Sequence, residues 1–263
     1  MFSNEHQKYL KKYKKSKKII FTSRFLIIIL FLFGWQLLVN LNILNGFIFS
    51  SPINIFNTLI MLIKTHNLFS HIWITIYETL LSFLLATFLG ILFASFLWLS
   101  KTVAKIVDPF LTILNSLPKV SLGPIIIIWF GANIKSIIIM AILITVMTST
   151  ISIYQGFKEI DKNLLILMKS LNANKLQMFF KLILPVNYQN IISTLKINIS
   201  LSLIGVIMGE LLVSKKGIGY LIMYGSQIFN LNLVMTGIIL LAIISAIIYY
   251  LILLLEKKLI KID

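Results

Sequence analysis

Two acidic residues lie inside long apolar segments and are the first candidates for chemistry. Glu78 falls within the apolar run 72–99, and Glu210 falls within the apolar run 191–213. A carboxyl group at membrane depth is energetically costly, so such an acid is a functional candidate by default. We therefore consider Glu78 and Glu210 as candidates for lining or gating a solute path.

Both acids also have a purely structural interpretation. Glu78 begins a row of small and polar residues at four-residue spacing that continues with Ser82, so its side chain should face protein rather than lipid. In this interpretation Glu78 is a hydrogen-bonding acid near the outer surface. Glu210 precedes Lys215 and Lys216, which makes an interfacial carboxylate paired with a nearby lysine the structural alternative. The sequence leaves both alternatives open.

The motifs of common catalytic and nucleotide-binding sites are absent from the sequence. None of the 12 glycines is followed by lysine, so the chain has no phosphate-binding P-loop, and it has no cysteine. The histidines form no H-E-x-x-H zinc motif, and we expect His66 and His71 to be solvated at an outer segment. We therefore expect no catalytic, cofactor or metal site in this chain.

The composition places these residues in a membrane protein. The chain has 263 residues, of which 59% are hydrophobic and 12% are charged, against roughly 45–50% and about 25% in soluble domains. The formal net charge of +16 does not indicate nucleic-acid binding, because the basic residues lie between apolar runs. A bilayer must therefore cover most of the surface.

Six apolar runs are long enough to cross a membrane, which takes about 20 residues each. The predicted spans are 25–44, 72–99, 109–130, 136–154, 191–213 and 231–255. The first follows a basic tail but lacks a small-residue cleavage pattern, so we expect it to be retained. Pro118 and Pro124 should break or kink the third.

The basic residues predict the orientation of the spans. With the amino terminus inside, 19 of the 24 Lys and Arg residues lie in inner segments and 4 lie in outer ones. An even number of spans with basic ends satisfies the positive-inside rule when both termini are cytoplasmic. We therefore expect a multi-pass protein of the cell membrane with a cytoplasmic tail at 1–24 and another at 257–263.

The longest predicted cytoplasmic segment, residues 156–189, contains two short helices. Asp161 can cap a first helix that runs through Lys169. Asn174, with Gln177 three positions later, approximates a capping box for a second helix. The two helices form a helix-turn-helix between the fourth and fifth spans.

A sharp turn joins these two helices. It contains Leu171, Asn172 and Ala173, and Asn172 tolerates a left-handed backbone conformation. The second helix is expected to end at Pro185. Because both helices carry an apolar face, the element is either an interfacial anchor or a docking element for a soluble partner.

Several segments resemble type I ABC importer permeases. Residues 164–168 (LLILM), 169–173 (KSLNA) and 183–185 (ILP) resemble the cytoplasmic EAA…G…I-LP loop of that family. The further marks are TIYETLLSF at 75–83, LP at 117–118, GP at 123–124, WFG at 129–131, GE at 209–210 and GIGY at 217–220. The resemblance is closest to the nitrate, sulfonate and taurine permease group and covers about 72–256. The chain departs from the pattern at 166–168, where ILM replaces Glu-Ala-Ala, and at Asn172, which replaces a glycine.

The resemblance implies an architecture and a set of partners. It implies an all-α bundle of six transmembrane helices, with 25–71 as the first helix and outer segment and 72–256 as the permease domain. The expected ATPase-docking residues, which form a coupling helix between helices four and five, are Lys169, Ser170, Leu171, Asn172, Ala173 and Asn174. ABC ATPase subunits would bind ATP, and an extracellular substrate-binding protein would deliver a small solute near 217–220. The solute would be nitrate-like, sulfonate-like or taurine-like, or a vitamin precursor.

Two other classes of protein remain as alternatives. An ion-gradient-driven secondary transporter would usually show internal repeats and several polar groups at mid-depth. No clear repeat relates the two halves of this chain, and only Glu78, Lys196 and Glu210 are charged within spans. The other alternative is a membrane assembly protein that transports no solute. For the permease we expect a homodimer, with a second similar permease as the alternative partner.

Overall fold

The chain folds into helices joined by short connections. The structure is a computed structural model that describes residues 4–65 and 67–259, and every regular element in those ranges is helical. The main helices are α1 (Asn4–Asn40), α3 (Pro52–Lys64), α4 (Asn67–Leu99), α5 (Lys101–Ser116), α6 (Gly123–Phe130), α7 (Ile134–Lys158), α8 (Lys162–Ser170), α11 (Tyr188–Val213), α12 (Ile218–Gln227) and α13 (Leu231–Leu259). The shorter elements are α2 (Gly46–Phe49), η1 (Lys119–Leu122), α9 (Lys175–Met178), the π-helical η2 (Phe179–Ile183) and α10 (Leu184–Val186). The all-α prediction is confirmed.

The described residues contain five helices that are long and apolar enough to cross a membrane, and a sixth segment that is bent. The straight candidates are Lys15–Asn40, Asn67–Leu99, Ile134–Lys158, Tyr188–Val213 and Leu231–Lys258. The sixth joins Lys101–Ser116 to Lys119–Phe130 across a bend of 88°. Counted as one segment, the bent pair completes the predicted set of six.

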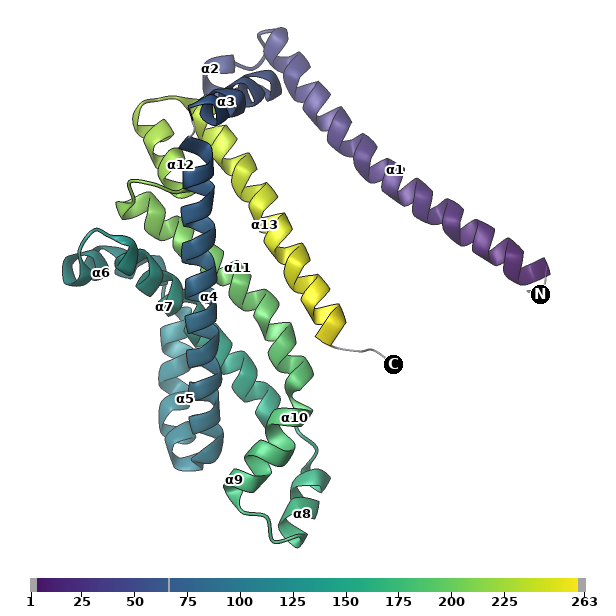
Figure 1. Cartoon of the computed structure of the whole chain (residues 1–263), viewed down its shortest axis with the longest axis vertical. Coiled ribbons are helices and arrows are strands. Elements are labelled where there is room, and N and C mark those ends of the chain that lie inside the picture. The colour runs from purple at the N-terminus through teal and green to yellow at the C-terminus, as the bar shows by residue number, and fades with distance from the viewer. Residues whose placement is uncertain (1–3, 66, 260–263) are drawn as a thin grey trace.

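The third predicted span, 109–130, is broken near Pro118, as predicted, but its predicted start is wrong. The helix α5 begins earlier, at Lys101, and ends at Ser116, two residues before Pro118. Leu117 has an extended backbone, with φ −67° and ψ 140°, as expected for a residue that precedes proline. The chain therefore turns sharply before η1 and α6 (Figure 1).

The helices α4, α7 and α11 form the centre of the bundle (Figure 1). Small residues let their backbones approach closely. A Cβ atom on Gly90 of α4 would lie 2.7 Å from Cβ of Ser149 on α7, and one on Gly205 of α11 would lie 2.5 Å from Cα of Ala141. The small-residue rows therefore pack inside the bundle, as predicted, where lipid supplies no hydrophobic driving force for helix association.

Buried polar side chains also join these three helices. Asn198 of α11 donates hydrogen bonds from Nδ2 to Oγ1 of Thr87 (3.0 Å) and to Oγ of Ser149 (2.9 Å). The hydroxyl groups of Thr145 and Ser202 lie 3.2 Å apart. Interhelical hydrogen bonds of this kind each contribute about 0.6–2 kcal/mol in membranes. They also select one register for the three helices, because a shifted helix would leave these groups unpaired.

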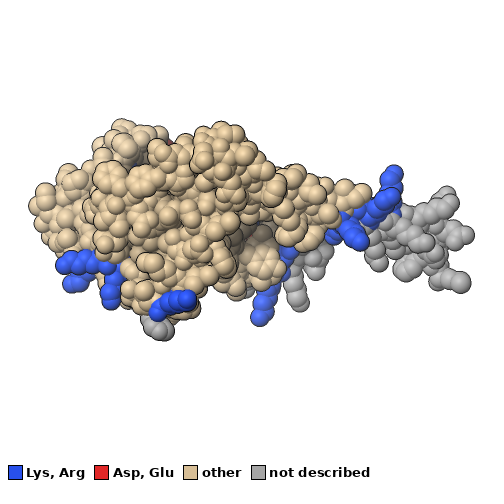
Figure 2. All heavy atoms as spheres, turned by 90° about the horizontal axis from the view of Figure 1, so that it is seen from above, with Lys and Arg blue, Asp and Glu red and all other residues tan. Residues whose placement is uncertain are grey.

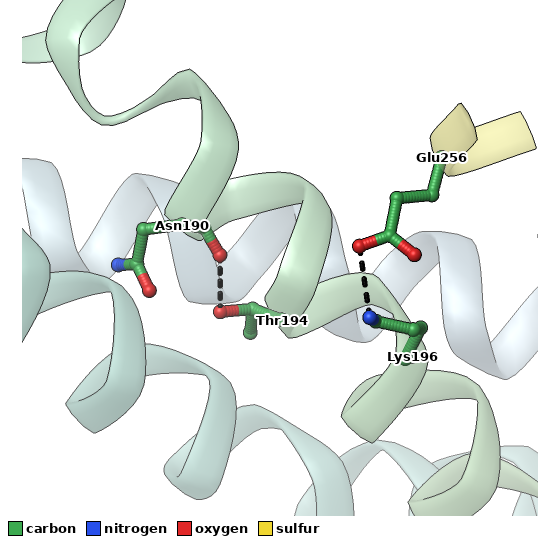
Figure 3. Close-up of polar contacts among 4 residues, drawn as sticks. All are labelled: Asn190, Thr194, Lys196 and Glu256. Atoms are coloured by element: carbon green, nitrogen blue, oxygen red, sulfur yellow. Dashed lines mark hydrogen bonds and ion pairs between the residues drawn. The ribbon is translucent and has the colours of Figure 1, made fainter. Parts of the chain in front are cut away.

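The helix α13 packs along α12, α11 and α3, and an ion pair ties its end to α11. Nζ of Lys196 lies 2.8 Å from Oε1 of Glu256 (Figure 3). Both side chains are mostly buried, at 28% and 18% exposure. Lys196 is the charged residue that the sequence placed inside an apolar span, and Glu256 is its partner.

The amino-terminal helix α1 departs from the rest of the molecule. It contacts α3 near its carboxyl end and otherwise extends away from the bundle (Figure 1). Apolar side chains along it, such as Phe25, Phe31 and Phe33, are exposed. Seen from above in Figure 2, uncharged residues cover most of the surface, and Lys and Arg project at its margins. Exposed apolar side chains of this kind are suited to contact with lipid chains or with another apolar protein surface.

Candidate functional site

The turn between α8 and α9 has the local structure that the sequence predicts. Oδ1 of Asp161 accepts a hydrogen bond from the backbone N–H of Asn163 (2.9 Å) and caps α8. Asn174 and Gln177 form a complete capping box, with bonds of 2.8 and 2.9 Å. Asn172 lies in the left-handed region, with φ 54°. The predicted caps and turn are confirmed.

Side chains of this turn project into solvent. Leu171 has 69% of its surface exposed, and the α8 side chains Ile166 and Leu167 are also exposed. The predicted coupling residues Lys169, Ser170, Asn172 and Asn174 are exposed as well, and Ala173 is half-buried. Exposed apolar groups on a capped turn form a surface on which a partner can pack.

An aromatic cluster attaches the turn to the ends of α4 and α7. Phe179, directly after α9, is buried and contacts the rings of Trp98 (5.6 Å between centroids) and Phe157 (5.7 Å). Ile183 and Ile153 are buried in the same apolar cluster. Because aromatic packing leaves few alternative arrangements, we expect a displacement of the turn to be transmitted to α4 and α7.

At the opposite end of the bundle, Glu210 joins three segments. One carboxylate oxygen accepts a hydrogen bond from Oγ1 of Thr75 on α4 (2.6 Å), and the other accepts one from the backbone N–H of Gly219 (2.6 Å). Thr75 in turn accepts a bond from the N–H of Ile218 (2.9 Å). Glu210 is 1% exposed. These bonds hold the start of α12 against α4 and α11.

The loop before α12 fits this carboxylate because its last residue, Gly217, is a glycine. Gly217 has φ 106°, a conformation that other residues rarely adopt. A Cβ atom there would collide with the carboxylate of Glu210. The N–H of Gly217 donates to Nδ1 of His71 on α4 (2.9 Å), and the His71 ring stacks on Tyr220. The loop before α12 is therefore held by α4 on one side and by Glu210 on the other.

Glu78 lies beside this network and is fully buried. It interacts electrostatically with Glu210, but neither of its carboxyl oxygens has hydrogen-bond geometry to any residue in the described part of the chain. It lines a cavity of about 260 Å³ together with Asn133 and Lys216. The prediction that Glu78 faces protein is confirmed, and the structure brings the two acids together in one polar cluster.

Two expectations for this end of the molecule are wrong. Glu210 bonds to Thr75 and to backbone N–H groups, whereas a lysine partner was the structural alternative. Among the residues that the structure describes, the one ion pair is that of Lys196 with Glu256. His71 is buried rather than solvated. His66 lies outside the described residues, and no group of three potential metal ligands occurs in the described part.

Sequence reasoning missed Thr75 and His71 as parts of this cluster. A signal was available, because His71, Thr75 and Glu78 are spaced by four and three residues and so share one face of α4. That face is the same as the small-residue row, which continues with Ser82. When polar residues continue a row of small residues that packs against other helices, the polar residues should also be buried in contact with those helices.

The fold and these two sites define a polytopic helical membrane protein with a capped, exposed turn at one end and a buried polar cluster at the other. Its overall fold matches a solved chain of the MetNI methionine ABC transporter in inward-facing conformations, with a TM-score of 0.67 at 16% identity. The match covers 74% of this chain and 97% of that chain. The fold is therefore that of an ABC importer permease.

The sequence comparisons identify the family. The family described as binding-protein-dependent transport system inner membrane component matches residues 86–261, and the chain belongs to it. A Bacillus subtilis protein named as an aliphatic sulfonates transport permease is 30% identical over 86% of this chain and 82% of its own length. The formylaminopyrimidine transport permease protein ThiX of Halalkalibacterium halodurans is 30% identical over 58% of this chain and 61% of its own. The resemblance to ABC importer permeases is thereby confirmed, and the chain is a permease subunit rather than a secondary transporter or an assembly protein.

Proposed function

We propose that this permease transmits force from a separate ATPase through the turn at Lys169, Ser170, Leu171, Asn172, Ala173 and Asn174. The observation that carries this proposal is the combination of an exposed, doubly capped turn with a buried aromatic attachment to α4 and α7. A partner that moves the turn would move the helix ends as one body, as in hinge or shear switching. The ATPase would bind ATP, and this chain would supply the path and the lever.

The solute path is proposed to form between two copies of the chain. One copy leaves α1 and much of the bundle surface apolar and exposed, which suits a second permease as well as lipid. An extracellular binding protein would deliver the solute to the end that carries Gly217 and Tyr220. Both termini would then be cytoplasmic, at the same end as the α8–α9 turn.

The substrate class that we propose is a small solute of the kind named for the relatives, either an aliphatic sulfonate or a pyrimidine-type vitamin precursor. The two relatives are named for different solutes, although each is 30% identical to this chain over the matched residues. We propose that Glu78 and Glu210 act at the gate, through the buried polar cluster that holds the start of α12 against α4 and α11. They are not proposed as solute ligands, because both side chains are fully or almost fully buried.

An arginine in the turn tests the docking proposal. We expect Ala173→Arg to abolish solute uptake and binding of the cognate ATPase, because a long charged side chain would enter the contact surface. Membrane insertion and detergent elution profile should be unchanged, since Ala173 lies outside the buried cluster.

The matched control is Gln189→Arg, which places the same side chain at an exposed position of the same end, outside the turn. It should retain ATPase binding and uptake. Normal ATPase binding and uptake by Ala173→Arg would contradict the docking role.

A further inference from the structure

Four lysines converge on one cavity at the end of the bundle that carries the α8–α9 turn. They come from four different helices: Lys101 from α5, Lys158 from α7, Lys169 from α8 and Lys175 from α9. The cavity has a volume of about 260 Å³. Lysines separated by as many as 74 positions in the sequence thus line the same space.

No ion pair involves these four lysines in the part of the chain that the structure describes. Within the described residues, none of the four lies within 4.0 Å of an acidic oxygen. Lys158 instead lies over the ring of Tyr154, at 5.1 Å from its centroid. An adjoining cavity of about 190 Å³ adds Lys105 and a single acid, Asp108. Like charges held together in this way repel each other, so an anion bound between them would be stabilised.

The inner wall of the cavity is apolar and aromatic. Leu97 and Met178 are buried beneath it, and Trp98 and Tyr154 line its side. The cavity lies where α4 and α7 end and α5 begins, at the level where apolar spans give way to basic segments. Trp and Tyr are enriched at that level because their rings are amphipathic. The cavity therefore lies at the depth of lipid headgroups.

An apolar groove of about 310 Å³ is lined by other residues of α4 and of the α9–η2 segment, and both α4 and α9 also contribute residues to the cavity. It is lined along α4 from Phe88 to Leu99 and across from it by Leu176 and Phe180. These twelve residues of α4 span roughly 17 Å, which is comparable to much of an acyl chain. The exposed rings of Phe88 and Phe180 leave this groove open to the bilayer.

We propose that the cavity binds the phosphate-bearing headgroup of an anionic phospholipid, with an acyl chain lying in the α4 groove. Basic pockets between transmembrane helices on the cytoplasmic side recognise lipid headgroups in this way. A lipid explains the basic and apolar walls together, whereas free phosphate would explain only the lysines. The assignment to the cytoplasmic leaflet rests on the proposed orientation.

The bound lipid would also connect the bundle to both arms of the turn. Lys169 is the first residue of the turn and Lys175 directly follows it, while Lys101 and Lys158 belong to α5 and α7. A headgroup bridging these four side chains stabilises the turn in its docked position. The anionic lipid content of the membrane would then adjust how strongly the turn is held for its ATPase.

Trp98 provides a probe within the cavity itself. The full-length chain with Trp35→Phe, Trp73→Phe and Trp129→Phe keeps Trp98 as its only tryptophan. It is reconstituted in phosphatidylcholine vesicles that contain, at equal mole fraction, either brominated phosphatidylglycerol or brominated phosphatidylcholine. We expect stronger quenching by the phosphatidylglycerol, from which a relative affinity is obtained. The measurement requires neither an ATPase nor a solute, so it can fail independently of the proposed function.

Removal of two cavity charges should abolish this preference. Each lysine near the headgroup contributes about 1 kcal/mol, so Lys101→Gln with Lys158→Gln should lower the relative affinity by up to about 30-fold. Lys101→Arg with Lys158→Arg keeps the charges and should keep the preference, which separates loss of binding from loss of folding.

The control Lys162→Gln with Lys181→Gln removes the same charge from exposed positions that do not line the cavity, and it should have no effect.

Three outcomes would overturn the proposal. Equal quenching by the two lipids in the parent chain would exclude a headgroup preference. Loss of the preference on adding millimolar inorganic phosphate would identify a free anion as the ligand. An unchanged lipid preference in the Lys101→Gln and Lys158→Gln variant, with loss of ATPase binding, would assign the lysines to the ATPase.

Discussion

The close contact between α11 and α7 at Gly205 makes a sharp prediction about stability. In the variant Gly205→Ala, the new Cβ would lie 2.5 Å from Cα of Ala141, 2.9 Å from its Cβ and 3.3 Å from its backbone N. Ordinary contact requires at least 3.4 Å, so the deficit is about 1 Å. Since the nearest atom belongs to the backbone, no side-chain rotation can relieve the collision, and the two helices must separate.

The magnitude follows from two opposing terms. Overpacking a close-packed contact costs about 1–3 kcal/mol, whereas replacing glycine by alanine inside a helix favours folding by up to about 1 kcal/mol. The first term should win because α7 and α11 pack along their length. We expect a net loss of about 1–2 kcal/mol, which corresponds to a fall of about 2–8 °C in apparent Tm.

The assay is thermal unfolding of the purified chain in detergent, followed by size-exclusion elution after heating. Gly34→Ala is the matched control, because a Cβ on Gly34 of α1 meets nothing within 4 Å. It should be neutral or slightly stabilising. Adding Ala141→Gly should rescue Gly205→Ala only in part, since the Cα and N of residue 141 remain in place. An unchanged Tm for Gly205→Ala, or full rescue by Ala141→Gly, would refute the inferred backbone contact.

Two further predictions concern the polar contacts of α11. Glu210→Ala should destabilise the loop before α12 by at least about 2 kcal/mol, because the hydroxyl of Thr75 and the N–H of Gly219 lose their acceptor. We expect faster hydrogen exchange at 217–219, with a smaller effect for Glu210→Gln. Equal exchange in the parent chain and both variants would contradict this role of Glu210. Lys196→Met should destabilise by about 1 kcal/mol or more, because it leaves the mostly buried Glu256 unpaired. The double variant with Glu256→Gln should regain apparent Tm, and no difference between the single and double variants would exclude a stabilising ion pair.

The sequence was sufficient for the local elements. Segment length and apolar composition predict the membrane helices, because a helix must satisfy its backbone groups within the bilayer wherever it crosses. The caps at Asp161 and Asn174 and the left-handed Asn172 were also predictable, since each depends on a few neighbouring residues. Pro118 indicated a break in the third span but not its angle, which depends on the packing of α5 and α6 against their neighbours.

The candidate sites depended on contacts between residues far apart in the chain. The sequence identified Glu210 as an acid inside an apolar span, but its partner Thr75 lies 135 positions away. Lys215 and Lys216 are close to Glu210 in sequence, and this proximity wrongly suggested a lysine as its partner. The convergence of Lys101, Lys158, Lys169 and Lys175 is likewise absent from any local pattern.

The sequence by itself thus determined that this chain crosses a membrane, where most of its helices lie and that it carries a capped turn between two short helices. Only the tertiary structure decided which acids and which lysines share a site. The physical reason is that composition and capping act over a few residues, whereas burial and charge neighbourhood are set by the packing of α4, α7 and α11 and by the attachment of the turn to their ends.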